Sequence, residues 1–172
     1  MAGRIYLDYN ASSPIHPEVA AEMRPLLEQD FGNPSSGHWA GRPARAAVEL
    51  ARRRTAALLD CAPEEIVFTS GGSEASNLAI KGAFFEARRR GIEAPHFVTT
   101  AVEHPATLEP LRFLERLGAV VTVLPVDRHG RIDPRQVEAA LTPGTVLVTM
   151  MHANNETGTL LPVEETAALL RP

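Results

Sequence analysis

Three polar segments of the chain carry side chains that could do chemistry, and each follows an apolar run. The first is residues 69–77, where two glycines and several hydroxyl residues lie between a β-branched run and a helical pattern. Glycines let the backbone approach a ligand closely, and the N–H groups and positive dipole end of a helix favour a phosphate. An ordinary capped turn is the plainer interpretation. The segment matches neither the P-loop nor the dinucleotide-binding pattern.

The other two segments are residues 99–105 and 152–158. His104 stands just beyond a predicted strand, where an imidazole could stack on a planar ring or move protons near neutral pH. The later segment holds two amides and a carboxylate, which are costly to bury without partners, so they should bond each other or a ligand. A surface-loop histidine and an asparagine-rich turn closed by Gly158 are the plainer interpretations.

An alternation of strands and helices must position these segments. We expect strands at residues 66–69, 96–100, 120–124 and 145–151, and helices at residues 17–28, from about 43 to 58, and at about 72–90, 105–117, 134–141 and from 162. This order predicts an α/β fold with a mostly parallel sheet and flanking helices. Such sheets bind ligands at the carboxyl ends of their strands, where all three segments lie. Together they describe a site for a flat phosphorylated cofactor.

Composition excludes several classes of partner. The net charge of -4 gives no electrostatic reason to expect nucleic acid or an anionic membrane. The single cysteine suits a reducing compartment, and no apolar run has the length of a membrane span or a signal peptide. The histidines share no metal-ligand spacing, so we expect no metal site. A cytoplasmic protein is the expectation.

Five ordered motifs resemble the cysteine desulfurases, which belong to the class V aminotransferase group of pyridoxal phosphate (PLP) enzymes, fold type I. The motifs are residues 6–14 (YLDYNASSP), 31–36 (FGNPSS), 69–82, 103–105 (EHP) and 154–158 (NNETG). The resemblance covers essentially the whole chain and implies the N-terminal portion of the fold type I large domain. Residues 1–40 would border the substrate pocket, and residues 41–172 would form a partial PLP-binding large domain, incomplete at its C-terminus.

The resemblance implies a cofactor site made of four residues. The backbone of Gly72 and the side chain of Ser73 would hold the phosphate of pyridoxal 5′-phosphate, with Ser73 standing where many relatives have threonine. His104 would stack on the pyridine ring and act as a catalytic residue in proton transfer. Asn155 would bond the ring hydroxyl.

The substrate implied by the resemblance is L-cysteine. It would yield L-alanine and an enzyme persulfide, whose sulfur supplies Fe–S clusters or thio-cofactors. Asn10, Ala11 and Asn155 would border or bind the substrate. A homodimer and a sulfur-acceptor protein are the implied partners.

The family residues that complete the chemistry lie outside the printed sequence. The Schiff-base lysine, the aspartate that pairs with the pyridine nitrogen and the nucleophilic cysteine all come from later segments in the family. Lys81, the one lysine, follows Ser73 by eight positions on the same predicted helix, about 12 Å along its axis, so it should point away from the ring. Cys61 has no nearby cation to activate it. We therefore expect the 172-residue chain alone to be inactive.

Two alternatives to this N-terminal fragment of a desulfurase remain open. The chain could be a non-catalytic split half or scaffold that needs a complementary C-terminal chain, because four strands would leave an open sheet edge. It could also belong to another class V enzyme, such as a selenocysteine lyase, which shares most of these motifs.

Overall fold

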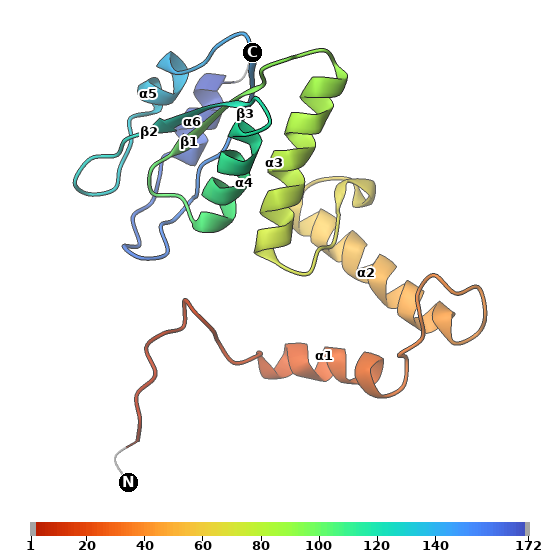
Figure 1. Ribbon diagram of the computed structural model, residues 1–172. Helices are drawn as coiled ribbons and strands as arrows, with labels where there is room; N and C mark the ends of the chain where they lie inside the picture. The colour runs from red at the N-terminus through yellow and green to blue at the C-terminus, as the bar shows by residue number, and fades with distance from the viewer. Residues whose placement is uncertain (1–2, 171–172) are drawn as a thin grey trace. The chain divides into compact units, whose positions relative to one another are not determined.

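The computed structural model describes residues 3–170, which divide between residues 68 and 69 into two compact units (Figure 1). The first unit contains helices α1 (Pro17–Glu28) and α2 (Gly41–Leu59) and the 3₁₀-helix η1 (Pro63–Glu65). The second contains strands β1 (His96–Thr100), β2 (Val120–Leu124) and β3 (Thr145–Val148), and helices α3 (Gly72–Arg89), α4 (Pro105–Glu115), α5 (Pro134–Ala139) and α6 (Val163–Leu170). The division predicted at residue 40, which concerned the substrate pocket, stays a prediction.

The second unit is built on a parallel sheet with the strand order β2–β1–β3. The central strand β1 is buried along its whole length, as its unbroken β-branched and aromatic character predicts for a strand covered on both faces. Phe97 stands opposite Val121 on one neighbour and Leu147 on the other. The parallel sheet with flanking helices confirms the α/β prediction.

Helices cover both faces of this sheet (Figure 1). Successive residues of a strand point to opposite faces, so Phe97 and Val98 begin two separate cores. Phe97 packs with Ile80 and Phe84 of α3 and with Leu111 and Leu114 of α4. On the opposite face Val98 packs with Ile132, Leu161, Val137 of α5 and Leu170 of α6.

His96, the first residue of β1, joins the three strands. Its Nδ1 lies 2.7 Å from Thr145 Oγ1 on β3, and its Nε2 lies 2.8 Å from Thr122 Oγ1 on β2. A hydroxyl can donate or accept, so either neutral tautomer of the ring is satisfied. Burial lowers the pKa of His96. These contacts fix the end of the sheet opposite the polar loops.

In the loop that precedes α2 in the first unit, the backbone passes close to Gly32. A Cβ at Gly32 would lie 1.9 Å from the carbonyl oxygen of Ala40, so no larger residue fits there. Asn33 Oδ1 accepts from Ser35 N at 2.8 Å, and Arg45 Nε donates to Pro34 O at 2.8 Å. The residues of the 31–36 motif therefore shape the entry to α2.

The strand predicted at residues 66–69 is wrong. The segment is extended, but among residues 3–170 it pairs with no strand, and Val67 and Phe68 are exposed. Arg52 on α2 holds it instead, donating to the carbonyl of Ile66 and lying over the Phe68 ring, 5.1 Å from its centroid. A β-branched run becomes a strand only where a neighbour offers backbone partners.

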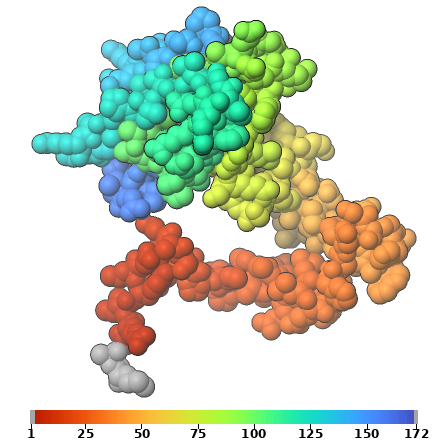
Figure 2. Space-filling model, viewed as in Figure 1, coloured from red at the N-terminus to blue at the C-terminus, as the bar shows by residue number. Residues whose placement is uncertain are grey.

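The turn after β2 projects from the second unit, in cyan in Figure 2. Asp127 shapes it, because its Oδ1 accepts from the backbone N–H groups of His129 and Arg131. Gly130 has a φ of +75°, which favours glycine. Thr159 Oγ1 donates to His129 O at 2.9 Å, so this turn also supports the loop after β3.

No helix in the described part of the chain is both long enough and apolar enough to span a bilayer.

Candidate functional site

The glycine turn forms the first turn of α3. Gly71 is the N-cap and Gly72 the first helical residue, so N–H groups that lack intrahelical partners point outward here. Within residues 3–170, a Cβ at either glycine would meet no atom closer than 4 Å. Glu74 Oε2 accepts from Ser70 N at 2.6 Å, and the bonds from Ser70 lower the pKa of Glu74. The space in front of the helix is open, and Ser73 is exposed beside it.

His104 is the N-cap of α4. Its Nδ1 accepts a hydrogen bond from Ala106 N at 3.0 Å, while the ring is exposed. Because Nδ1 acts as the acceptor, the neutral ring carries its proton on Nε2. The cap therefore fixes both the direction of the imidazole and the nitrogen that is free to donate.

Asn155 lies exposed in the loop after β3, where Nδ2 donates to Glu156 Oε1 at 3.0 Å. Its neighbour Asn154 is buried and organises the turn, because Oδ1 accepts from the N–H groups of Glu156 at 3.0 Å and Thr157 at 2.9 Å. Gly158 closes the turn, donating to Asn154 O at 2.8 Å with a φ of +71°. These groups were expected to bond each other or a ligand, and the structure shows bonds among them.

Two side chains tie the loop of His104 to the loop of Asn155. Glu103 is 8% exposed, and its Oε1 accepts from Thr100 Oγ1 at 2.9 Å and from Met151 N at 2.8 Å. Asn154 Nδ2 donates to Val102 O at 3.1 Å. These bonds bring together two segments that the sequence placed at the same edge of the sheet.

Sequence reasoning selected these segments but missed Glu103 and Asn154 as the residues that turn inward. One local signal was present. Thr100 and Glu103 have the threonine-x-x-glutamate spacing of a capping box, which places the two side chains within bonding reach.

The topology places the glycine turn at the same end of the second unit. The end of α3 leads through residues 90–95 into the start of β1, and α3 packs against α4 and β3. The helix therefore runs antiparallel to β1, and its first turn faces the end where the strands finish. In Figure 1 the first turns of α3 and α4 both lie at the lower end of the unit.

Asn10 and Ala11 belong to the first unit. They lie in a turn in which Ala11 N donates to Asp8 O at 3.1 Å, and the Tyr6 hydroxyl donates to the same oxygen at 2.8 Å. The Tyr6 ring meets Tyr9 edge to face, with 5.0 Å between centroids. The turn is well defined by itself, and its predicted role at the substrate pocket stays a prediction.

Lys81 lies in the middle of α3, and Cys61 lies in the first unit. The Nζ of Lys81 sits 4.9 Å from the centroid of the Phe113 ring, so the ammonium is engaged with the last turn of α4. Cys61 is a half-buried free thiol of the first unit. Across residues 3–170, no group of three or more His, Cys, Asp or Glu side chains is placed to hold a metal ion.

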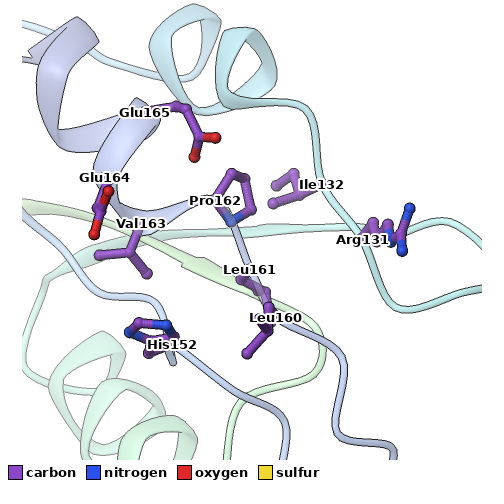
Figure 3. A pocket seen from close by; sticks show the side chains of 9 residues that line it. All are labelled: Arg131, Ile132, His152, Leu160, Leu161, Pro162, Val163, Glu164 and Glu165. Carbon is purple, nitrogen blue, oxygen red and sulfur yellow. The ribbon is translucent and has the colours of Figure 1, made fainter.

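A surface pocket of about 310 Å³ lies elsewhere in the second unit (Figure 3). Arg131 and Ile132, His152 and residues 160–165 line it, so it is formed by the loops after β2 and β3 and by the start of α6. None of the residues predicted to hold the cofactor lines this pocket. It is a hollow between loops and separate from the candidate site.

Comparison with known proteins identifies the family. The family model described as aminotransferase class-V matches residues 5–172. The chain belongs to the class-V aminotransferase family. The cysteine desulfurase IscS of Dictyoglomus turgidum is 46% identical over 171 residues, which are 99% of this chain and 43% of the relative. That of Clostridium botulinum is 43% identical over 99% of this chain and 42% of the relative. This class-V chain thus spans less than half the length of these curated relatives.

Solved structures agree with the class-V fold. A NifS-like protein superposes with a TM-score of 0.91 and 34% identity, covering 98% of this chain and 45% of the other. The structure of SspA in complex with cysteine gives a TM-score of 0.87 and 41% identity over 95% of this chain and 46% of the other.

Class-V aminotransferases depend on PLP, and the residues present fit that group. The open first turn of α3 offers N–H groups and a positive dipole end to a phosphate. The exposed imidazole of His104 offers a flat face, and the amide of Asn155 offers a donor for a ring hydroxyl. Each candidate residue therefore has the chemistry that one part of this cofactor requires.

Proposed function

We propose that this chain is part of a PLP-dependent cysteine desulfurase that converts L-cysteine to L-alanine and leaves the sulfur as a persulfide on an enzyme cysteine. One observation carries the proposal. His104 and Asn155 extend from loops that side chains hold together, in a chain that matches curated cysteine desulfurases along 99% of its length. The similarity to SspA, whose structure contains cysteine, supports the same substrate.

The first turn of α3 binds the phosphate in this proposal. The N–H of Gly72 and the hydroxyl of Ser73 donate to phosphate oxygens, and the absence of a Cβ at Gly72 lets the phosphate approach the backbone. When bound, the cofactor supplies an electron sink for bonds at the substrate carbons.

His104 and Asn155 orient the ring. The imidazole stacks on it with Nδ1 held by the α4 cap, so Nε2 is the atom that donates or exchanges a proton. Asn155 Nδ2 donates to Glu156 Oε1, and in this proposal the amide of Asn155 donates to the ring hydroxyl when the cofactor is bound.

The remaining parts of the proposal concern partners and groups outside these contacts. Asn10 and Ala11 border the substrate, the enzyme acts as a cytoplasmic homodimer, and a sulfur-acceptor protein takes the persulfide sulfur for Fe–S clusters or thio-cofactors. The lysine that holds the cofactor and the cysteine that takes the sulfur come from outside residues 1–172, from the same polypeptide or a complementary one. The chain alone is then inactive.

The test is alanine release from L-cysteine by the intact protein that carries this chain. Ser73→Ala, His104→Ala and Asn155→Ala should each lower the rate by about tenfold or more, since each removes a positioned group. His129→Ala is the control, because His129 is exposed in the turn after β2, outside all three segments. Faster alanine release from selenocysteine would favour a selenocysteine lyase, and no release from either amino acid would favour a scaffold.

A further inference from the structure

We propose that two buried polar residues, Glu103 and Asn154, form a positioning clamp for the cofactor site. Each directly precedes a residue that the proposed function places on the cofactor, His104 and Asn155 respectively. The consequence for the cofactor rests on the proposed function. The clamp itself rests on the hydrogen bonds between the two loops.

Burying the carboxyl group of Glu103 costs free energy, so stability alone does not explain its position. Its carboxylate accepts hydrogen bonds from a hydroxyl and a backbone N–H, both neutral, and burial raises its pKa. Removing a carboxyl group from water is unfavourable unless its hydrogen bonds compensate, and an apolar residue of similar size often serves stability as well. What Glu103 adds is an acceptor at one defined point, aimed at Met151 N.

Asn154 uses both ends of its amide. The oxygen gathers the N–H groups of Glu156 and Thr157 and so builds the turn that presents Asn155. The nitrogen reaches across to Val102 O. A single side chain therefore shapes one loop and attaches it to the other.

The two hydrogen bonds between the loops, Met151 N to Glu103 and Asn154 to Val102 O, reach the backbone close to the functional side chains. Met151 N and Val102 O are the anchor points, and strand pairing between β1 and β3 has ended before this level, at Val148. Side chains therefore set the spacing of the loops at the site. A displacement of about 1 Å at a site can lower function about a hundredfold, so loss of a bridge should act on cofactor binding without touching the cofactor.

Glu103→Leu and Glu103→Gln in the intact protein test the clamp. Leucine keeps the volume and removes the acceptor, whereas glutamine keeps an acceptor oxygen. Thr166→Val is the control, because Thr166 is a buried residue of α6 whose hydroxyl donates to Pro162 O at 2.7 Å, outside both loops. We expect Glu103→Leu to weaken PLP binding about tenfold, Glu103→Gln to stay within about twofold, and Thr166→Val to leave it unchanged.

Amide hydrogen exchange of residues 149–158, measured without cofactor, is the second readout. Exchange should be faster in Glu103→Leu than in the wild type, and Glu103→Gln should exchange at the wild-type rate. Unchanged exchange, or unchanged PLP affinity in Glu103→Leu, would overturn the clamp. If Glu103→Leu does not fold, Asn154→Asp tests the other hydrogen bond between the loops, because it replaces the amide nitrogen that donates to Val102 O with a carboxylate oxygen that cannot donate. A wild-type protein that binds no PLP would contradict the proposed function, and the exchange data would still decide whether Glu103 holds the loops.

Discussion

The Nε2 atom of His96 lies 2.8 Å from the hydroxyl oxygen of Thr122, so a ring on β1 is bonded to the neighbouring strand β2. The other ring nitrogen bonds Thr145 on β3. Protonating this ring would place a charge inside the sheet, and burial accordingly lowers the pKa of His96 from its ordinary value of 6.5.

The first prediction concerns stability against pH. Because the folded pKa of His96 is below the unfolded value of 6.5, the unfolded state binds the proton first as pH falls. The stabilisation is complete above that value and is lost as pH falls through the folded pKa. Urea unfolding between about pH 7.5 and 5 should show this loss, and His96→Gln should reduce the slope. His129→Gln, which changes an exposed histidine, should leave the slope unchanged. An equal effect of both variants would show that His96 is not the source of the pH dependence.

Glu103 should contribute with the opposite sign. Burial raises its pKa above the ordinary value of 4.5, so its stabilisation is complete below that value and is lost as pH rises through the folded pKa. Glu103→Gln should therefore gain stability relative to wild type at about pH 8, and the gain should shrink towards about pH 4.5. Chemical denaturation at the two pH values measures the difference. A gain that is constant with pH would show that titration of Glu103 is not its source.

Adjacent asparagines should respond differently to alanine. Asn154→Ala should lower the free energy of unfolding by about 1–3 kcal/mol, because it removes a buried side chain and the hydrogen bonds that it makes with two backbone N–H groups and Val102 O. Asn155→Ala should change it by no more than about 0.5 kcal/mol, because that side chain is exposed. Under the proposed function, Asn155→Ala is nevertheless the variant with lower activity at unchanged stability. Equal stability losses for the two variants would disprove this division of roles.

Adjacent phenylalanines on α3 provide a second matched pair. Phe84 is 3% exposed and belongs to the same core as Phe97, whereas Phe85 is 56% exposed. Phe84→Ala should cost about 3–5 kcal/mol of stability through lost burial and the cavity left behind. Phe85→Ala should cost no more than about 1 kcal/mol, mostly from its edge-to-face contact with Phe84. Thermal unfolding measures both, and a larger loss for Phe85 would mean that its exposed face is covered in the protein studied.

Regular patterns in the sequence predicted most of the second unit. The unbroken run of residues 96–100 predicted the central strand with its observed bounds, and the alternation of strands and helices predicted the parallel sheet. Residues 66–69 have the same apolar character but form no strand, because a strand also needs a pairing neighbour and pattern alone does not identify one. The strand predicted at residues 145–151 ends at Val148. Thr149 N still donates to Val98 O of β1, but Met151 N bonds the Glu103 side chain instead of a neighbouring strand.

The candidate site could be predicted only to the level of its segments. Loops at the ends of parallel strands have no simple periodicity, so the letters of Asn154-Asn155 do not say which residue turns inward. For Glu103 the one local signal is its spacing from Thr100. That choice depends on contacts between residues 48 and 52 positions apart.

The position of β3 also bears on how the second unit folds. β1 pairs with β2 after only α4 has intervened, whereas its pairing with β3 joins residues 49 positions apart, as His96 and Thr145 are. Longer loops cost more entropy to close, and non-local pairings slow folding. We expect the β1–α4–β2 portion to condense first and β3 to dock on it afterwards. The bonds that join the loops of His104 and Asn155 would then be among the last to form, so a folding intermediate would already hold β1, α4 and β2 together and still lack the candidate site.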